Sequence, residues 1–172
     1  YYVPAKYSPL FDKRYRILMP WQYMERDSII RRILLQEKPD IIEVTDKYTL
    51  SAIGAMIRTN RFKSIGRPIL VHFSCERMDD NVSSFIARGR AGQWFARRVI
   101  GAYTMPSFDY HIANSAYTAD EFYQSVADWR DTNKGGGLLN WAWRFFKAPR
   151  VPVDERIFVC PRGVDSVHFT PN

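Results

Sequence analysis

Residues 110–122 read Tyr-His-Ile-Ala-Asn-Ser-Ala-Tyr-Thr-Ala-Asp-Glu-Phe, and this stretch decides the fold class. Residues 110–114 are mostly apolar and predict a strand. A helix is expected to begin at Thr118, because Thr118 and Glu121 have the spacing of a capping box, in which each side chain satisfies a backbone N–H group of the other residue. Asp120 and Glu121 also suit the positive end of a helix dipole. A strand that passes directly into a helix is the repeating unit of an α/β domain.

The same alternation continues on both sides of this stretch. Short apolar runs predict further strands at residues 15–19, 41–45, 69–73 and 157–160, of which the first is expected to be buried. Helical patterns are present from Ser28, which suits the N-cap, to Pro39, and at residues 51–58 and 81–102. This order predicts an α/β fold with a Rossmann-like, doubly wound, mostly parallel sheet, in which ligands bind at the carboxyl ends of the strands.

Composition and charge limit the functional classes. With 172 residues, 46% of them hydrophobic and 25% charged, the chain fits one globular domain and is neither disordered nor fibrous. No apolar run reaches the roughly 18 residues that a membrane span needs. The net charge of +7 indicates a polyanionic partner, which could be nucleic acid, anionic lipid headgroups or a phosphorylated substrate. Nucleic acid is not expected as a partner, because the sequence contains no recognised nucleic-acid motif. The two cysteines indicate a reducing compartment and a cytoplasmic protein.

Polar residues follow the predicted strand at 41–45. Asp46, Lys47 and Tyr48 are candidates for contact with a hydroxylated substrate, because they come directly after the strand. The alternative is a turn that starts a helix, with Thr45 or Asp46 as its cap. The two interpretations fit these residues equally well.

A second polar group surrounds the end of the strand at 69–73. His72 has the near-neutral pKa that suits proton or phosphate chemistry, Glu76 can bind sugar hydroxyls, and Arg77 can bind phosphate oxygens. The alternative for His72 is a hydrogen-bonded residue of the core, which its position in a buried strand favours when it is considered alone. His72 and Cys75 supply too few ligands for zinc, so no metal site is expected.

Residues 138–147, Leu-Leu-Asn-Trp-Ala-Trp-Arg-Phe-Phe-Lys, form the most unusual segment. Aromatic rings at the depth of lipid headgroups, with basic residues beside the phosphates, are typical of an interfacial membrane anchor. The candidate contact residues are Trp141, Trp143, Arg144, Phe145 and Phe146. The alternative is a helix that packs on the core of the domain or on a partner domain. The glycines at 135–137 lack the lysine of a phosphate-binding loop and predict a flexible loop.

Two segments together resemble family-4 glycosyltransferases. Residues 108–122 closely resemble a segment of that family in which a strand is followed by a serine and an acidic helix. Residues 159–165, Val-Cys-Pro-Arg-Gly-Val-Asp, with Phe-Thr-Pro at 169–171, are similar to the connection that leads there into the nucleotide-sugar-binding domain. Residues 38–43 resemble the entry to one of the family's strands, and His72 lies where many members carry a histidine close to the transferred sugar. The resemblance covers most of the chain from about residue 39.

This resemblance implies one half of a two-domain GT-B fold. Residues 1–160 would form the N-terminal, acceptor-side domain without the strand and Gly-rich loop with which the family opens. Residues 161–172 would begin the linker to the C-terminal domain, and residues 128–152 would be an insertion that faces a membrane or a partner. The C-terminal domain would bind most of the sugar donor, so we expect the isolated chain to be inactive.

The function that the resemblance implies is a retaining glycosyltransferase. It would transfer a hexose from a UDP- or GDP-sugar to a lipid or saccharide acceptor, without a cofactor or a metal, in the cytoplasm or at the inner face of the membrane. His72 would be catalytic. The substrate-binding residues would be Asp46, Lys47 and Tyr48 at the rim of the acceptor pocket, Glu76 and Arg77 in its wall, and Ser115 at its floor. Two alternatives stay open: a basic, non-enzymatic module that binds anionic membrane or nucleic acid, and a domain of a nucleotide-sugar epimerase of similar fold.

Overall fold

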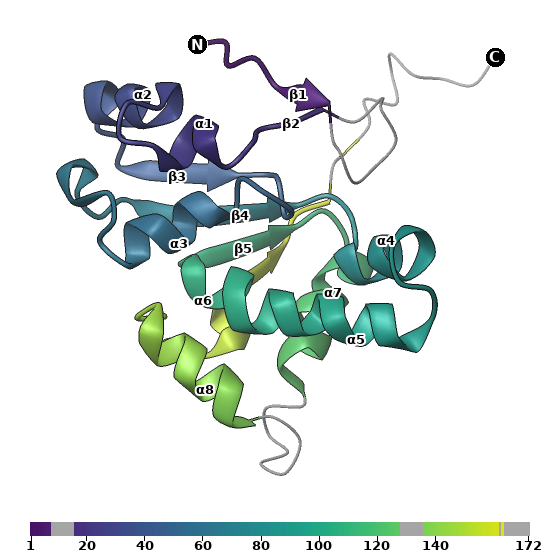
Figure 1. The fold of residues 1–172 in the computed structure, drawn as a ribbon. Coiled ribbons are helices and arrows are strands. Elements are labelled where there is room, and N and C mark those ends of the chain that lie inside the picture. Colours follow the sequence, from purple (N-terminus) through teal and green to yellow (C-terminus); the bar gives the residue numbers. More distant parts are fainter. Residues whose placement is uncertain (8–15, 128–135, 162, 164–172) are drawn as a thin grey trace.

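The computed structural model describes residues 1–7, 16–127, 136–161 and 163. Its centre is a parallel sheet with the strand order β3-β4-β5-β6 (Figure 1). The strands are β3 (Ile41–Val44), β4 (Ile69–Ser74), β5 (Tyr110–Ala113) and β6 (Ile157–Val159). This all-parallel sheet, flanked by helices, confirms the predicted Rossmann-like α/β class.

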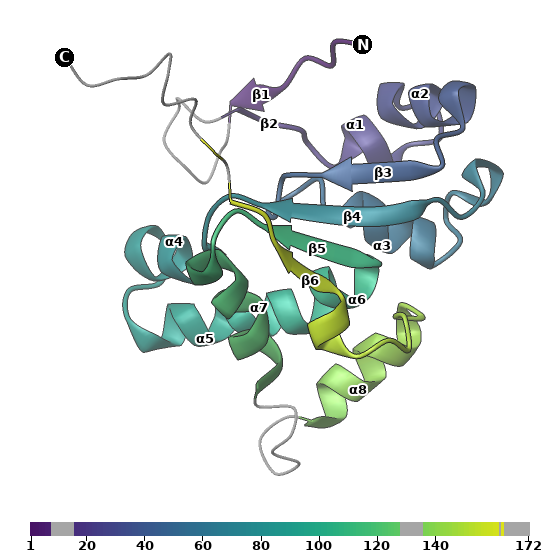
Figure 2. The ribbon, with the colours of Figure 1, turned by 180° about the vertical axis from the view of Figure 1, so that it is seen from behind.

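The connections between the four strands all advance in one direction across the sheet. Because such crossovers are right-handed, the connecting helices lie on one face. On this face β4 and β5 bury Leu70, His72 and Ala113 beneath the helices. The connecting helices are α3 (Ala52–Arg58), α4 (Met78–Phe85), α5 (Arg90–Val99), α6 (Met105–Ser107), α7 (Ala116–Ala127) and α8 (Gly136–Phe145). Figure 2 shows the molecule from behind. Because side chains alternate along a strand, Tyr110 of β5 and Phe158 of β6 lie on the other face of the sheet, and both are exposed.

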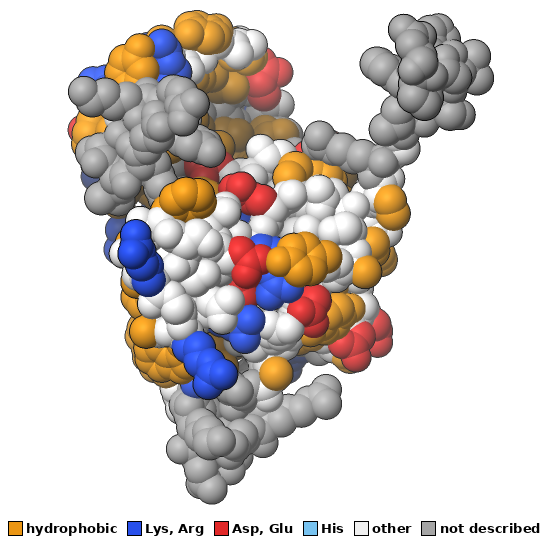
Figure 3. Space-filling model, turned by 90° about the vertical axis from the view of Figure 1, so that its right-hand side faces the viewer, with side chains coloured by type: hydrophobic (Ala, Val, Ile, Leu, Met, Phe, Trp, Pro, Cys, Tyr) orange, Lys and Arg blue, Asp and Glu red, His pale blue; other side chains and the backbone are white. Residues whose placement is uncertain are grey.

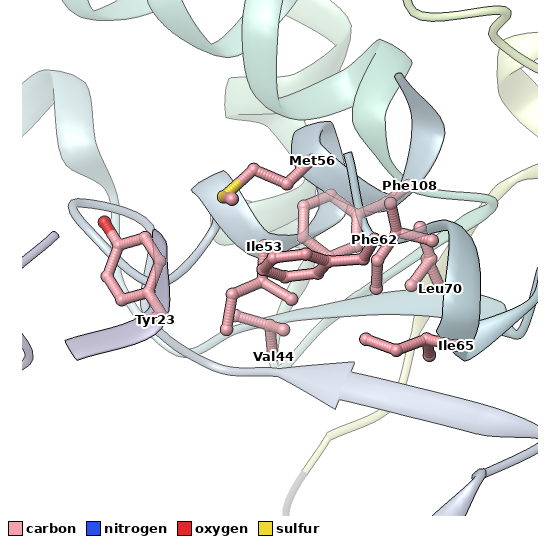
Figure 4. Close-up of a cluster of buried hydrophobic side chains, with 9 residues drawn as sticks. Tyr23, Val44, Ile53, Met56, Phe62, Ile65, Leu70 and Phe108 are labelled. Atoms are coloured by element: carbon pink, nitrogen blue, oxygen red, sulfur yellow. The ribbon is translucent and has the colours of Figure 1, made fainter. Parts of the chain in front are cut away.

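Two apolar clusters fill the space between the sheet and the helices. In the first, Val44 and Leu70 of the sheet meet Ile53 of α3, and Phe62 and Phe108 close the cluster (Figure 4). The second joins β5 and β6 to α4, α5 and α7. Each large apolar side chain that is fully buried here stabilises the fold by about 1.5–3 kcal/mol. The carboxyl ends of the strands are therefore supported by a packed apolar core.

The N-terminal part differs from the prediction of a buried strand at 15–19. Among the described residues of this segment, 16–19, only β2 (Arg16–Ile17) is a strand, and it pairs antiparallel with β1 (Lys6–Tyr7), outside the main sheet. The Arg16 guanidinium lies over the exposed Tyr7 ring, 4.7 Å from its centroid, so this pair lies at the surface. The helices α1 (Trp21–Met24) and α2 (Ile29–Glu37) follow, and Ser28 caps α2 as predicted.

The continuous helix predicted at 81–102 is wrong, because α4 and α5 are separate helices. Gly89 lies between them with φ +82°, a backbone conformation that residues other than glycine rarely adopt. The division explains why the apolar residues of this region do not follow one stripe. The remaining short elements are η1 (Lys63–Ile65), the π-helical η2 (Ile100–Thr104) after α5, and η3 (Val153–Glu155) before β6.

Among the described helices, none combines the length and the apolar character that a membrane span requires.

Candidate functional site

The carboxyl ends of β3, β4 and β5 bring together three loops that the sequence placed at strand ends. Figure 3 looks at the molecule from the side toward which the strand arrows of Figure 1 point, and acidic and basic side chains gather in the middle of that face. The loops carry Asp46, Glu76 and Ser115. The structure therefore brings the predicted substrate-binding residues to one edge of the sheet, although it gives several of them structural partners.

Asp46 is a cap of the turn that leads into α3. Its carboxylate accepts hydrogen bonds from the backbone N–H groups of Tyr48 at 2.7 Å and Leu50 at 3.0 Å. It also accepts from the Thr49 backbone at 3.3 Å and from the Thr49 hydroxyl at 2.6 Å. The cap interpretation of this loop thus describes the geometry, since both carboxylate oxygens are engaged with the chain.

Lys47 lies in the interior instead of at a rim. Its ammonium group is 2.5 Å from Glu121 Oε2 of α7 and also donates to the Glu76 carbonyl oxygen. Burial raises the pKa of Glu121, and the ion pair with Lys47 opposes this shift. The other oxygen of Glu121 accepts from the Asp79 N–H at 2.8 Å. Glu121 therefore does not complete a capping box, because it is turned into the core to hold Lys47.

Arg77 links α4 to α7 by hydrogen bonds. Its guanidinium forms a two-pronged pair with Asp79 at 2.9 and 2.8 Å and also donates to Asp120, Gln124 and the Tyr117 carbonyl oxygen. These bonds use every N–H donor that an arginine has, so no N–H group of Arg77 is left to bind a phosphate. The hydrogen bonds that Arg77 donates to Asp79 raise the pKa of Arg77 further above its ordinary value.

Asp79 is the buried centre of this network. It pairs with Arg77 and, at 2.8 Å, with Arg97 of α5. Burial acts to raise the pKa of Asp79, but the hydrogen bonds from the two guanidinium groups outweigh it and lower this pKa to about 2. The negative charge of Asp79 is therefore permanent near neutral pH.

Glu76, Tyr48 and Asn81 form the part of the edge that is open to a ligand. The Asn81 amide donates to the Tyr48 hydroxyl oxygen at 2.8 Å and to Glu76 Oε2 at 3.0 Å. The Glu76 side chain is exposed, and burial raises the pKa of Tyr48 to about 12, so the phenol stays protonated. A carboxylate, an amide and a phenol side by side can bind the hydroxyl groups of a sugar. Asn81 was missed because it lies inside a helical stretch, away from the strand end.

Ser115 is the N-cap of α7, three residues before the predicted helix start. Its hydroxyl oxygen accepts from the Thr118 N–H at 3.2 Å and lies 2.9 Å from the Thr118 hydroxyl. The neighbouring Asn114 donates to the Cys75 carbonyl oxygen at 3.0 Å and so joins the ends of β4 and β5. Both side chains are half-buried.

His72 is fully buried, two residues before the end of β4. Its ring lies 5.3 Å from Phe108, 5.6 Å from His111 and 5.8 Å from Phe122, measured between centroids. Neither ring nitrogen has a hydrogen-bond partner among the described residues. Burial, together with the nearby His111 and Lys47, lowers the pKa of His72 well below 6.5, so the imidazole is neutral. The side chain does not reach the edge, and its catalytic role stays a prediction.

Helix α8 packs one side on the domain, as the second interpretation of segment 138–147 expects, and membrane contact by this segment stays a prediction. Leu139, Ala142 and Phe146 are buried, and the Trp143 indole donates to the Gly101 carbonyl oxygen of η2 at 2.9 Å. Trp141, Phe145 and Arg144 face outward and are exposed. Of the predicted insertion at 128–152, residues 128–135 lie outside the described residues, as do most residues of the predicted linker at 161–172.

Comparison with curated proteins finds a similar protein whose name states its activity. No family model matches the chain, and no solved structure matches it. Over 120 residues, 70% of its length, the chain is 29% identical to a GDP-mannose-dependent alpha-(1-6)-phosphatidylinositol dimannoside mannosyltransferase of Mycobacterium tuberculosis, in strains H37Ra and CDC 1551. The chain is similar to a glycosyltransferase.

This similarity supports the general kind of protein that the sequence motifs indicated, a glycosyltransferase. The match covers 27% of these relatives, so the chain spans about a quarter of the length of the curated proteins it matches. The described residues contain no group of three or more His, Cys, Asp or Glu side chains placed to hold a metal ion.

Proposed function

We propose that this chain is the acceptor-side domain of a retaining glycosyltransferase with a GT-B fold. The enzyme transfers a hexose from a GDP- or UDP-sugar to a lipid or saccharide acceptor, with the donor bound mainly by a second domain. The observation that carries this proposal is the similarity to a mannosyltransferase over 70% of the chain. The name of that relative specifies GDP-mannose and a phosphatidylinositol-based acceptor, which favours a GDP-sugar and a glycolipid here.

The site geometry supports a role in acceptor binding. Parallel α/β sheets bind ligands at the carboxyl ends of their strands, and this edge presents Glu76 and Asn81 to solvent beside Tyr48. The buried ion pair of Lys47 with Glu121 and the network of Arg77 hold these groups in place. We therefore assign Lys47 and Arg77 to positioning, and Glu76, Tyr48 and Asn81 to direct contact with sugar hydroxyls.

The geometry does not favour His72 as a general acid or base. A general acid or base works best with a pKa near the working pH, whereas burial shifts the pKa of His72 well below 6.5. A role at the transferred sugar would need a rearrangement that brings the imidazole to the edge.

The proposed location is the cytoplasmic face of a membrane, with α8 toward the membrane or a protein partner. The exposure of Trp141 and Phe145 on a helix whose opposite side is packed on the domain supports this part of the proposal. A lipid acceptor would be consistent with such an orientation.

Saccharide binding by the 172-residue chain tests the acceptor site. Titration with methyl α-mannoside, followed by NMR, is expected to shift the amide signals of Glu76, Asn81 and Asn114. Glu76→Gln should weaken binding about tenfold, because it removes a charge-assisted hydrogen bond. The matched control is Glu155→Gln, since Glu155 is an exposed glutamate in η3, at the opposite edge of the sheet. Signals that shift away from the carboxyl edge, or an equal loss in both variants, would refute the proposed site.

A further inference from the structure

The outward side of α8 carries a compact group of exposed apolar side chains. Leu138, Trp141 and Phe145 are 56%, 59% and 51% exposed, although their spacing of three and four residues places them on one side of the helix. The rings of Trp141 and Phe145 stack, with centroids 5.2 Å apart and an interplanar angle of 15°. We call these three residues the apolar stripe. Leaving such rings in water costs free energy that an apolar medium would recover.

A basic pocket lies at the C-terminal end of the same helix. It has a volume of about 490 Å³ and is lined by Asn140, Trp143, Arg144, Lys147, Ala148, Pro149 and Arg150. Its three cationic side chains are exposed, and no carboxylate lines it. Among the described residues, none of the ion pairs involves Arg144, Lys147 or Arg150. This sets the pocket apart from Arg77, whose charge is fully compensated by carboxylates.

The wall of the pocket is anchored to the domain. The Arg58 guanidinium donates to the Lys147 carbonyl oxygen at 3.2 Å and pairs with Asp109, which fixes the turn after α8. Trp143 forms the inner wall and is held by its hydrogen bond to Gly101 and by the Arg156 guanidinium, 5.2 Å from its ring centroid. Cations on an anchored turn lose little conformational entropy when they bind an anion.

We propose that the basic pocket binds the phosphate of an anionic phospholipid headgroup while the apolar stripe enters the boundary between headgroups and acyl chains. Charge complementarity identifies the occupant, because cations that form no ion pair with any described residue, beside exposed aromatic rings, match the two layers of an anionic membrane surface. A helix of this length lies in the plane of the interface and does not span the bilayer. The inference rests on the proposed membrane-facing orientation of α8 and adds the class of ligand and the residues that bind it.

Vesicle flotation with the full chain tests this inference. We expect binding to vesicles of phosphatidylcholine with about one third phosphatidylglycerol, and at least tenfold weaker binding to phosphatidylcholine alone. The variant Lys147→Glu/Arg150→Glu should lose the preference for anionic lipid, because each basic residue near such a surface strengthens binding roughly fivefold. Trp141→Ala/Phe145→Ala should weaken binding to both kinds of vesicle by tenfold or more, because it removes the inserted rings.

Matched controls separate a local site from bulk charge and bulk hydrophobicity. Arg88→Glu/Arg90→Glu makes the same change in net charge at exposed positions just before α5 and at its first residue, and Phe85→Ala removes a ring that is 77% exposed. Both controls should bind vesicles like the unmodified chain. Equal losses in controls and test variants, or equal binding to neutral and anionic vesicles, would overturn the inference.

Inorganic phosphate distinguishes the source of the anion. At constant ionic strength, phosphate should compete with anionic vesicles for the pocket more strongly than chloride does. If the chain binds phosphate through Lys147 and Arg150 but does not bind vesicles, the lipid assignment is overturned in favour of a soluble phosphate ligand. Saccharide binding at Glu76 is measured separately, so the failure of one proposal leaves the other to be judged on its own result.

Discussion

Lys47 and Glu121 show how a residue that looks exposed in the sequence becomes part of the interior. The side chains of this ion pair are 2% and 0% exposed, and the pair joins the loop after β3 to α7. The lysine also donates to the Glu76 carbonyl oxygen, and the glutamate accepts from the Asp79 N–H. A buried charge that loses its partner costs far more free energy than an exposed charge does.

Lys47→Met is therefore expected to lower the free energy of unfolding by about 3 kcal/mol, because it leaves Glu121 buried without its cation. Urea denaturation followed by circular dichroism measures the change. The double variant Lys47→Met/Glu121→Leu should recover most of the loss, since it removes both charges and keeps apolar volume. A double variant as unstable as the single one would show that the ion pair is not the source of the effect.

At the scale of elements, η2 is the place where helices from distant parts of the chain meet. Gly101 lies in η2, and its carbonyl oxygen accepts the hydrogen bond of Trp143 from α8. A Cβ atom at Gly101 would lie 2.4 Å from the Ser125 carbonyl oxygen of α7. The absence of a side chain at Gly101 thus lets α7 approach η2 closely, and α8 also packs on η2.

Gly101→Ala is expected to destabilise the protein by about 2 kcal/mol, because backbone atoms of α7 must move to admit the methyl group. Thermal unfolding at neutral pH gives the comparison. Gly137→Ala serves as the control, since Gly137 has no atom within 4 Å of an added Cβ and alanine favours a helix by up to about 1 kcal/mol. An unchanged melting temperature for Gly101→Ala would contradict the close packing of α7 on η2.

At the scale of the whole molecule, two neutral histidines lie at the centre of the fold. His72 and His111 occupy paired positions on β4 and β5 and are both fully buried. Burial is the main cause that lowers the pKa of His111 to about 3, and it also lowers the pKa of His72. In the unfolded chain each ring takes up a proton as the pH falls through 6.5. Unfolding is therefore coupled to proton uptake below that pH.

The free energy of unfolding should accordingly fall as the pH is lowered from 6.5 to about 4.5, by up to about 1.4 kcal/mol per pH unit for each histidine. Urea denaturation at a series of pH values measures this slope. His72→Phe should reduce the slope by about half, because one of the two buried rings then no longer titrates in the unfolded chain. A slope that does not change in the variant would mean that His72 is not buried as a neutral ring.

The strands of the main sheet and their order along the chain follow from local patterns. β3, β4, β5 and β6 match apolar runs within one residue at each end, because buried parallel strands need β-branched and apolar residues whatever surrounds them. The cap of α2 was predictable for the same reason, since Ser28 needs only the next backbone N–H groups.

Two strongly patterned segments nevertheless gave wrong boundaries. The spacing of Thr118 and Glu121 matched a capping box, but Glu121 turns inward to Lys47, seventy-four residues away in the sequence. Residues 81–102 had enough apolar residues for one long helix, but Gly89 allows a break so that α4 and α5 can pack on each other. In each case contacts between distant residues outweigh the local preference.

The sequence alone was sufficient for the α/β class, for the polar residues at the strand ends and for the aromatic, basic character of segment 138–147, because these depend on residue type and spacing along one element. Only the tertiary structure could show that Arg77 and Lys47 are held inside by carboxylates, that Asn81 joins Glu76 at the open edge, and that α8 exposes Trp141 beside a basic pocket. The physical reason is that exposure and charge compensation depend on which elements meet in space, and a strand-end position leaves that choice open.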